Sequence, residues 1–445
     1  MLIAIFMVAA LLPAFNELTG KQMVIPAGQP VFWLSVTGLL LVTGVVAGSY
    51  PAFFLSSLNP VRVLKSSLIF TPGTTLFRKA LVVFQFTLCI VLIVGMIVIY
   101  RQVQYVQTKN LGYDRENLVY LPLEGDLIKK YDLFKNEAGK IPGVESISKM
   151  KESPTVIGHS INDIRWEGKD PNLSTSFADA AVGYDFVKTM KLQLKEGRDF
   201  SRDFADSASY LLNEAAVKKT GYQNPVGMTL WMGDHKGTII GVLKDFHFNS
   251  MHEAIEPLFI RLADNQKWGT ILVRTQAGKT KEAIEGLEKI CKKLNPDFTF
   301  SYQFSDQEYA KLYKSEQVVS TLSNYFAFLA IFISCLGLFG LAMFTAGQRI
   351  KEIGVRKVLG ASVTNIAAVL SAGFLKPVVI AMLIAFPVSW YAMNRWLQDY
   401  AYKIDISWWV FALAGFLTLG IALLTVSFQS IKAALVNPVK SLRSE

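Results

Sequence analysis

Charge is scarce in this 445-residue chain. Charged residues make up 18% of it, hydrophobic residues 51%, and the mean hydropathy is +0.33. Soluble domains have about a quarter of their residues charged, so the composition excludes an ordinary soluble enzyme. Cysteine is also rare: the three copies, Cys89, Cys291 and Cys335, are too few for a disulfide framework. We expect all three to be free thiols.

Apolar residues are concentrated in long runs that carry almost no charge. Five runs are close to the roughly 20 residues that a helix needs to cross a bilayer: Val31–Tyr50, Ala80–Tyr100, Leu322–Ala346, Phe374–Met393 and Trp408–Phe428. A sixth run, Met1–Phe15, is slightly shorter. It has no Lys or Arg before Lys21, which argues against a secretory signal. We therefore expect six membrane-spanning helices.

The positive charge lies outside the longest polar stretch. Residues 101–318 hold 30 basic and 30 acidic side chains, so the net charge of +10 belongs entirely to the rest of the chain. Most of it falls in the segments 51–79 and 347–373 and in the tail 429–445. Cytoplasmic loops carry such an excess, which predicts that 101–318 lies outside the cell membrane. Because these basic residues flank apolar runs instead of forming one patch, we expect contact with membrane lipid and no nucleic-acid partner.

These signals predict a segmented chain. The segments are two transmembrane helices in 1–50, a cytoplasmic loop 51–79, a transmembrane helix 80–100 that continues into a stalk, an external domain 101–318, a transmembrane helix 319–346, a cytoplasmic segment 347–373, two transmembrane helices in 374–428, and a cytoplasmic tail 429–445.

The tail repeats an earlier segment. Residues 49–66 align without gaps on residues 427–444, and Asn59-Pro60-Val61 matches Asn437-Pro438-Val439. A repeat this long implies a duplicated half. On this interpretation, 1–50 holds the last two helices of a truncated first half, and the chain is a fragment of a longer protein. The alternative is a six-helix protein that starts at Met1.

The external stretch has the periodicity of an α+β domain. A strand at Asn117–Leu123, a helix at Leu127–Lys140 and a strand at Val144–Lys149 form one unit. A second strand–helix–strand unit covers Thr270–Arg274, Thr280–Leu294 and Phe298–Phe304. Between them lie short strands at Tyr210–Leu212, Thr238–Leu243 and Leu258–Leu262, which predict an inserted subdomain. We expect the helix from Ala80 to reach about Lys109 and the helix into Leu322 to start near Asp306.

The sharpest local signal is the cytoplasmic segment Gln348–Ala361, which has helical spacing and a glycine, Gly360, placed to end the helix. Such a basic helix could simply lie at the bilayer edge. A single carboxylate, Glu352, among four bases and a glycine, Gly354, inside the helix favour a protein-docking surface instead.

This segment resembles the cytoplasmic coupling segment of FtsX/MacB-type ABC transporter permeases, the type VII ABC superfamily. Other stretches are similar to that family in the same order: Arg78–Phe86, Glu196–Phe200, Asn213–Ala215, Asn224–Gly227, Ile239–Phe246 and Asn437–Glu445. The resemblance covers 77–445. The double-length arrangement resembles a form common in Bacteroidetes, here lacking most of its first half.

The resemblance implies a polytopic α-helical membrane protein with a large α+β extracytoplasmic domain, a MacB-like periplasmic core, inserted between transmembrane helices. It implies a location in the bacterial inner membrane, with about 101–318 in the periplasm. It also implies an ATPase-coupling site, formed by Arg349, Lys351, Glu352, Ile353, Gly354, Arg356, Lys357, Leu359 and Gly360.

The implied function is that of a non-catalytic permease subunit. A separate cytoplasmic ABC ATPase would bind the ATP, and its hydrolysis would move the periplasmic domain by mechanotransmission. The implied substrates for export or efflux are peptides, antibiotics, lipids or lipoproteins. Further partners would be a periplasmic adaptor or hydrolase, and the missing first half or a second permease copy. The alternative is a membrane-anchored signalling protein of the same fold that regulates a cell-wall hydrolase.

Two other patterns do not support a cofactor or metal site in this chain. Gly278-Lys279-Thr280 opens a predicted helix, but Val273 occupies the position where a phosphate loop needs a further glycine. His247 and His252 are five residues apart, whereas zinc-binding pairs on one helix are usually four apart. We interpret them as surface histidines at a strand end.

Overall fold

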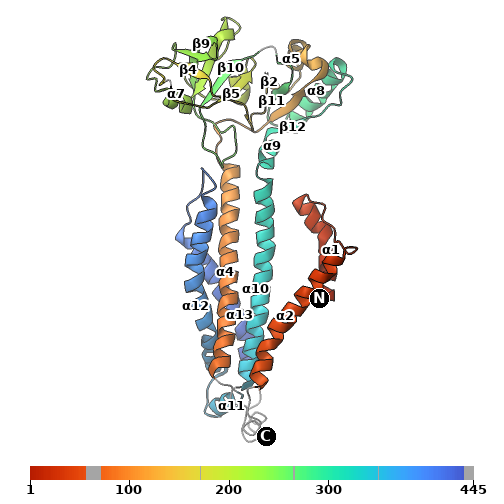
Figure 1. The fold of residues 1–445 in the computed structure, drawn as a ribbon, viewed down its shortest axis with the longest axis vertical. Helices are drawn as coiled ribbons and strands as arrows, with labels where there is room; N and C mark the ends of the chain where they lie inside the picture. Colours follow the sequence, from red (N-terminus) through yellow and green to blue (C-terminus); the bar gives the residue numbers. More distant parts are fainter. Residues whose placement is uncertain (57–71, 171, 264–265, 349, 435–445) are drawn as a thin grey trace. The chain divides into compact units, whose positions relative to one another are not determined.

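The computed structural model describes residues 1–56, 72–170, 172–263, 266–348 and 350–434 (Figure 1). The chain divides into two compact units. The first comprises Met1–Ile97, Val318–Trp390 and Ser407–Glu445, and the second comprises Val98–Gln317 and Tyr391–Ile406. We describe each unit by itself.

The first unit is helical. Among the described residues, six helices are long and apolar enough to cross a membrane. They are α1 (Leu2–Thr19), α2 (Pro30–Ser56), α4 (Pro72–Thr108), α10 (Lys314–Gln348), α12 (Val363–Leu397) and α13 (Trp408–Ala434). The last residues of α4 and α12 and the first residues of α10 belong to the second unit. The short helix α11 (Ile350–Val358) lies between α10 and α12.

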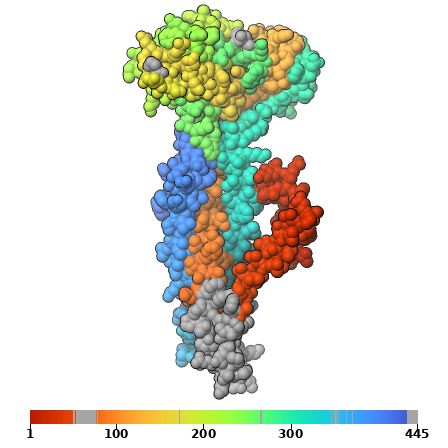
Figure 2. Space-filling view, in the orientation of Figure 1, coloured from red at the N-terminus to blue at the C-terminus, as the bar shows by residue number. Residues whose placement is uncertain are grey.

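The first two helices leave their apolar surfaces uncovered. None of the residues in the spans of α1 and α2 is buried, whereas half of the span of α4 is. Figure 2 shows the atoms of α1 and α2 open on the face drawn. The expected equivalence of 1–50 with 374–428 stays a prediction, because Asn59-Pro60 and Asn437-Pro438 lie outside the described residues.

The second unit is built on one mixed sheet, with strand order β12-β1-β11-β2-β5-β10-β7-β9-β8-β4 among the described residues; β3 pairs with β5 and β6 with β9. The strands are β1 (Leu118–Leu123), β2 (Val144–Met150), β3 (Ser160–Ile161), β4 (Ile164–Trp166), β5 (Phe177–Val182), β6 (Leu194–Gly197), β7 (Ser209–Asn213), β8 (Thr229–Met232), β9 (His235–Leu243), β10 (Leu258–Leu262), β11 (Gly269–Thr275) and β12 (Gln303–Phe304). The pairs β5–β10 and β7–β9 are parallel, and the other pairs are antiparallel.

Helices cover the sheet because its central strands present apolar residues to both faces. Helices α5 (Tyr131–Ala138) and α8 (Thr280–Leu294) pack on one face of β1, β11 and β2, around Phe134 and Leu287. On the opposite face, α6 (Phe186–Met190) and α9 (Ser305–Lys311) contribute Phe186 and Tyr309 to the largest buried cluster. Helix α7 (Glu214–Thr220) packs beside β7, and the 3-10 turns η1 and η2 cover Gly125–Ile128 and Asp206–Ala208.

Three expected elements differ from the structure. The helix predicted over Leu127–Lys140 is divided into η1 and α5, because the residues before Tyr131 make i→i+3 hydrogen bonds. The predicted strand over Phe298–Phe304 is reduced to β12, because Phe300, Tyr302 and Phe304 pack ring against ring and only the last two residues pair with β1. The helix expected from Asp306 is broken into α9 and α10. A tight turn at Leu312-Tyr313 makes i→i+3 bonds instead and leaves Tyr313 1% exposed in the core.

Candidate functional site

Helix α11 has a well-defined end. Gly360 has a φ of 89°, and its backbone N–H donates to the carbonyl of Lys357 at 3.1 Å. The N–H of Ala361 donates to the carbonyl of Arg356 at 2.9 Å. These two bonds form a Schellman motif, which needs a residue that tolerates the left-handed region. Gly360 therefore fixes the length of α11 and the direction in which the chain leaves it.

The chain enters α12 through a second cap. The Ser362 hydroxyl accepts a hydrogen bond from the backbone N–H of Asn365 at 3.2 Å, as an N-cap residue does. With Gly360, it confines the connection between α11 and α12 to a few residues of defined geometry.

One charged pair lies along α11. Arg356 Nη2 is 2.7 Å from Glu352 Oε1, one helical turn away, and both side chains are about half exposed. An exposed pair of this kind is worth about 0.3–0.5 kcal/mol. This pair can therefore be exchanged for contacts with another protein at little cost.

In contrast to this charged pair, three apolar side chains are solvent-accessible at the end of α11. Val355 is 49% exposed, Val358 67% and Leu359 80%, and their i, i+3, i+4 spacing puts them on one face. Ile353 is buried, at 7%. Of these residues, Ile353 and Leu359 were expected in the site. Val355 and Val358 were missed, although their spacing alone indicates a shared face.

The other expected site residues are only partly described. Arg349 lies outside the described residues. Lys351 and Gly354 lie within α11, and Lys357 is half-buried near its end. We call the face formed by Glu352, Val355, Arg356, Val358 and Leu359 the α11 face.

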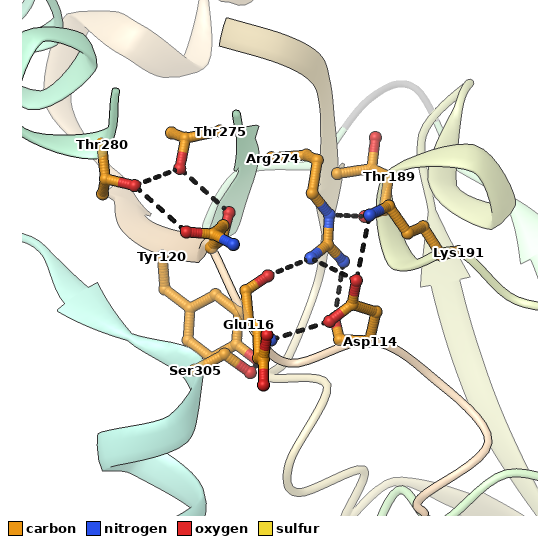
Figure 3. Close-up of polar contacts among 10 residues, drawn as sticks. Asp114, Glu116, Tyr120, Thr189, Lys191, Arg274, Thr275, Thr280 and Ser305 are labelled. Atoms are coloured by element: carbon orange, nitrogen blue, oxygen red, sulfur yellow. Dashed lines mark hydrogen bonds and ion pairs between the residues drawn. The ribbon is translucent and has the colours of Figure 1, made fainter. Parts of the chain in front are cut away.

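In the second unit, a buried arginine joins three segments (Figure 3). Arg274 on β11 is 1% exposed. Its guanidinium donates to the carbonyls of Thr189 at 2.9 Å and Asp114 at 2.6 Å, and to that of Glu116. Burial alone would raise the pKa of the Asp114 carboxyl. The hydrogen bond from Lys191 and the charge of Arg274 nevertheless hold this pKa below its usual value. The guanidinium thus fixes the chain between α4 and β1 against β11 and α6.

The Gly-Lys-Thr sequence has a structural role beside this network. Thr280 starts α8, and its hydroxyl lies 2.9 Å from that of Thr275 and donates to Asn117 Oδ1 at 3.3 Å (Figure 3). In a phosphate loop, a hydroxyl at this position binds a metal ion. Here the Thr280 hydroxyl instead joins Thr275 of β11 to Asn117, which directly precedes β1.

An open polar cleft of about 620 Å³ lies next to Asp114 and Lys191 and extends to Lys244 and His247. The interpretation of His247 as a surface histidine is wrong. It is 7% exposed, and its ring meets that of Tyr402 edge-on at 4.6 Å. Burial, with a smaller contribution from Lys109, lowers the pKa of His247 to about 4. Its imidazole is therefore neutral at physiological pH.

The loop between α12 and α13 is fastened to the other parts of the second unit. The N–H groups of Ala401 and Tyr402 donate to the carbonyls of His252 and Met251 at 3.2 and 3.3 Å. The side-chain amide of Gln102 donates to the Tyr402 carbonyl and accepts from the Ile404 N–H, both at 2.9 Å. We call this set of contacts, from Asp399 to Ile404, the external clasp.

His252 completes the external clasp. Its Nε2 is 2.9 Å from Glu316 Oε1, its Nδ1 is 3.0 Å from the Asp399 carbonyl, and its ring stacks on Tyr400 at 4.0 Å. Within the described residues, no group of three His, Cys, Asp or Glu side chains is arranged to hold a metal ion. His252 therefore serves as a bridge between chain segments.

Comparison with known proteins assigns both parts of the chain. Residues 324–438 match the model of the FtsX-like permease C-terminal region, and residues 80–289 match the MacB-like periplasmic core domain. The macrolide export ATP-binding/permease protein MacB of Sodalis glossinidius is 25% identical over 302 residues, 63% of this chain and 45% of that protein. A MacB of Aggregatibacter actinomycetemcomitans is 25% identical over 196 residues, 42% of this chain and 30% of its own length. The chain thus spans less than half of the length of these relatives.

Two further matches are of different kinds. An uncharacterised ABC transporter permease of Methanocaldococcus jannaschii is 22% identical over 369 residues, 77% of this chain and 87% of that protein. The crystal structure of the periplasmic region of MacB from Actinobacillus actinomycetemcomitans covers 46% of this chain and 97% of its own, at 18% identity and a TM-score of 0.33.

The two family models and the six apolar helices define a polytopic inner-membrane protein with a periplasmic α+β domain between its transmembrane helices. The chain belongs to the FtsX/MacB-type family of ABC transporter permeases. Its expected family, fold class and membrane location are thereby confirmed.

Proposed function

We propose that the α11 face binds a cytoplasmic ABC ATPase and that the chain is the non-catalytic permease subunit which this ATPase drives. The observation that supports this most is the exposure of Val355, Val358 and Leu359 on a helix with a fixed end. Apolar side chains of this size are the groups whose burial stabilises a protein interface, each by about 1.5–3 kcal/mol. Glu352 and Arg356 flank them and can pair with charges on the ATPase.

Movement of α11 would reach the periplasmic domain through α10 and α12. Helix α10 is continuous from Gln348 to Lys314, and α12 leads into the external clasp. In this mechanotransmission, ATP is bound and hydrolysed on the partner, and this chain needs no cofactor. We propose export or efflux of a peptide, an antibiotic, a lipid or a lipoprotein as the outcome, since MacB relatives are named for macrolide export.

Copurification with the ATPase tests the proposal. Leu359→Glu places a charge in the proposed contact and should weaken binding at least tenfold, and Glu352→Lys should weaken it by reversing one charge. Lys432→Ala, at an exposed position of α13, is the control and should bind normally. Normal copurification and normal ATP turnover in Leu359→Glu and Glu352→Lys would show that α11 only lies on lipid.

The polar cleft beside His247 favours one second candidate. A cleft of about 620 Å³ in the periplasmic domain could bind a soluble ligand, as the domain of a signalling protein or a regulator of a cell-wall hydrolase would. Loss of an adaptor from pull-downs after charge reversal at Lys244 would favour export. Loss of hydrolase activation would favour regulation.

A further inference from the structure

Within the first unit, α4 and α12 enclose an open groove of about 580 Å³. They lie side by side and run in the same direction (Figure 1). Helix α4 contributes Leu76, Ala80, Val83 and Thr87, which recur on one face of the helix. Helix α12 contributes Gly373, Pro377, Ile380 and Ile384. The floor of the groove is therefore almost entirely apolar.

Two lysines lie at one end of this apolar groove. Lys79 and Lys376 both line it and are both exposed. Lys79 and Lys376 each come three residues after the first groove residue of their helix, Leu76 on α4 and Gly373 on α12, so both lie toward the same end of the groove in two parallel helices. Among the contacts between described residues, neither ammonium group has an acidic partner. The two positive charges are thus available to an anion that lies outside the described residues.

A backbone acceptor lies at the same end. Pro377 has no N–H, so it cannot donate to the carbonyl of Gly373, one turn earlier in α12. Both residues line the groove. This carbonyl therefore lacks its usual donor within α12 and can accept a hydrogen bond from a ligand in the groove.

The length and the charge of the groove favour a phospholipid over another helix. From Leu76 to Thr87 the groove is about 16 Å long, at 1.5 Å per residue, or about half of a bilayer's apolar thickness. An apolar transmembrane helix would cross the whole apolar thickness and bring no anion to Lys79 and Lys376. A phospholipid brings both an acyl chain of one leaflet's length and a phosphate at its end.

We propose that this groove is a binding site for an anionic phospholipid. An acyl chain lies along Val83, Thr87, Ile380 and Ile384. The phosphate lies between Lys79 and Lys376, and a headgroup hydroxyl donates to the Gly373 carbonyl. This site is distinct from the α11 face and requires no transport of the lipid.

Native mass spectrometry of the full chain in detergent, titrated with phosphatidylglycerol or phosphatidylcholine, tests the proposal. The wild type should retain phosphatidylglycerol preferentially. Since each lysine near an anionic headgroup contributes about fivefold in affinity, Lys79→Ala with Lys376→Ala should lower retention by roughly 25-fold. Lys432→Ala, a basic residue of α13 outside the groove, should change nothing. Equal retention of both lipids, or equal loss in the control, would overturn the proposal.

A second variant separates the groove from the lysines. Val83→Trp fills the groove while leaving both ammonium groups in place, and it should also abolish retention; gel filtration checks that each variant remains monodisperse. A photoreactive residue at Val83 should cross-link to phospholipid. A cross-link to a second protein chain instead would show that the groove is a helix-packing surface, which contradicts a lipid site.

Discussion

Arg274 carries a buried charge whose nearest partners are backbone carbonyls. Removing the guanidinium takes the donor from the buried carbonyl of Thr189 and from the part-buried carbonyls of Asp114 and Glu116. Unsatisfied buried groups cost about 1–3 kcal/mol each. We therefore expect Arg274→Met to destabilise the periplasmic domain by about 1–3 kcal/mol, measured as a lower thermal unfolding midpoint in detergent. Arg202→Met is the control, because its pair with Asp132 is exposed and should contribute little. Equal midpoints for the two variants would contradict this role.

Asp199 and His247 should give the same domain opposing responses to pH. Burial raises the pKa of Asp199 to about 6, so protonation stabilises the fold as the pH falls from about 6 to 4. Burial lowers the pKa of His247 to about 4, so the unfolded chain takes up its proton first and stability falls between about pH 6.5 and 4.

The two effects should largely cancel in the wild type. We expect Asp199→Asn to lose stability between pH 6.5 and 4 and His247→Phe to gain it, by a few degrees in the unfolding midpoint. Thermal unfolding of the full chain at both pH values measures this. Parallel pH profiles for the two variants would show that neither side chain titrates as described.

Among the secondary-structure elements, the sequence predicts a helix best when one face of that helix is apolar and the other is polar. Helix α8 has the expected bounds, and β10 and β11 lie within one residue of the strands predicted there. Strand β5 was missed because all six residues of Phe177–Val182 are buried, which removes the alternation. Its Asp179 is tolerated inside because Arg261, on the neighbouring β10, donates to both carboxylate oxygens at 2.9 and 3.0 Å. A partner so distant in sequence leaves no local signal.

In the candidate site, too, features that depend on residues distant in the sequence cannot be predicted from local sequence. The helix over 350–358 and its end at Gly360 follow from local spacing and a glycine. The exposed fractions of Val355 and Val358 depend on what packs beside them, and local spacing does not reveal that. The external clasp joins Gln102 to residues 300 positions later, so nothing in either segment predicts it.

Gln102 offers a test of the external clasp. It is fully buried, and its amide bonds both the Tyr402 carbonyl and the Ile404 N–H. We expect Gln102→Leu to release the loop, so that the amides of Ala401, Tyr402 and Ile404 exchange hydrogen faster by about tenfold or more, the equivalent of about 1.4 kcal/mol. Gln104→Leu, on an exposed position of the same helix, should leave exchange unchanged. Unchanged exchange in Gln102→Leu would mean that backbone bonds alone hold the loop.

At the scale of the whole molecule, the charge distribution and the family assignment agree on sidedness. The excess of basic residues lies outside 101–318, and the MacB-like periplasmic core matches 80–289. The turn between β8 and β9 should therefore be accessible from outside the membrane and α11 from the cytoplasm. Asp234, in that turn, has a fully exposed side chain, and Leu359 is 80% exposed. Lys169, in the same domain, is a poorer position for a labelling cysteine than Asp234. Its ammonium donates to the Ile164 carbonyl at 2.6 Å and covers the Trp166 ring.

Cysteine labelling can test this sidedness because the native thiols are few. Cys89 and Cys291 are buried and Cys335 is partly so, and replacing all three with alanine or serine gives a silent background. In that background, Asp234→Cys should react with a membrane-impermeant maleimide in intact spheroplasts. Leu359→Cys should react only after permeabilisation, because the bilayer blocks a charged reagent. The reverse pattern, with Leu359→Cys labelled in intact spheroplasts and Asp234→Cys protected, would place α11 outside the cell and remove the basis for its contact with a cytoplasmic ATPase.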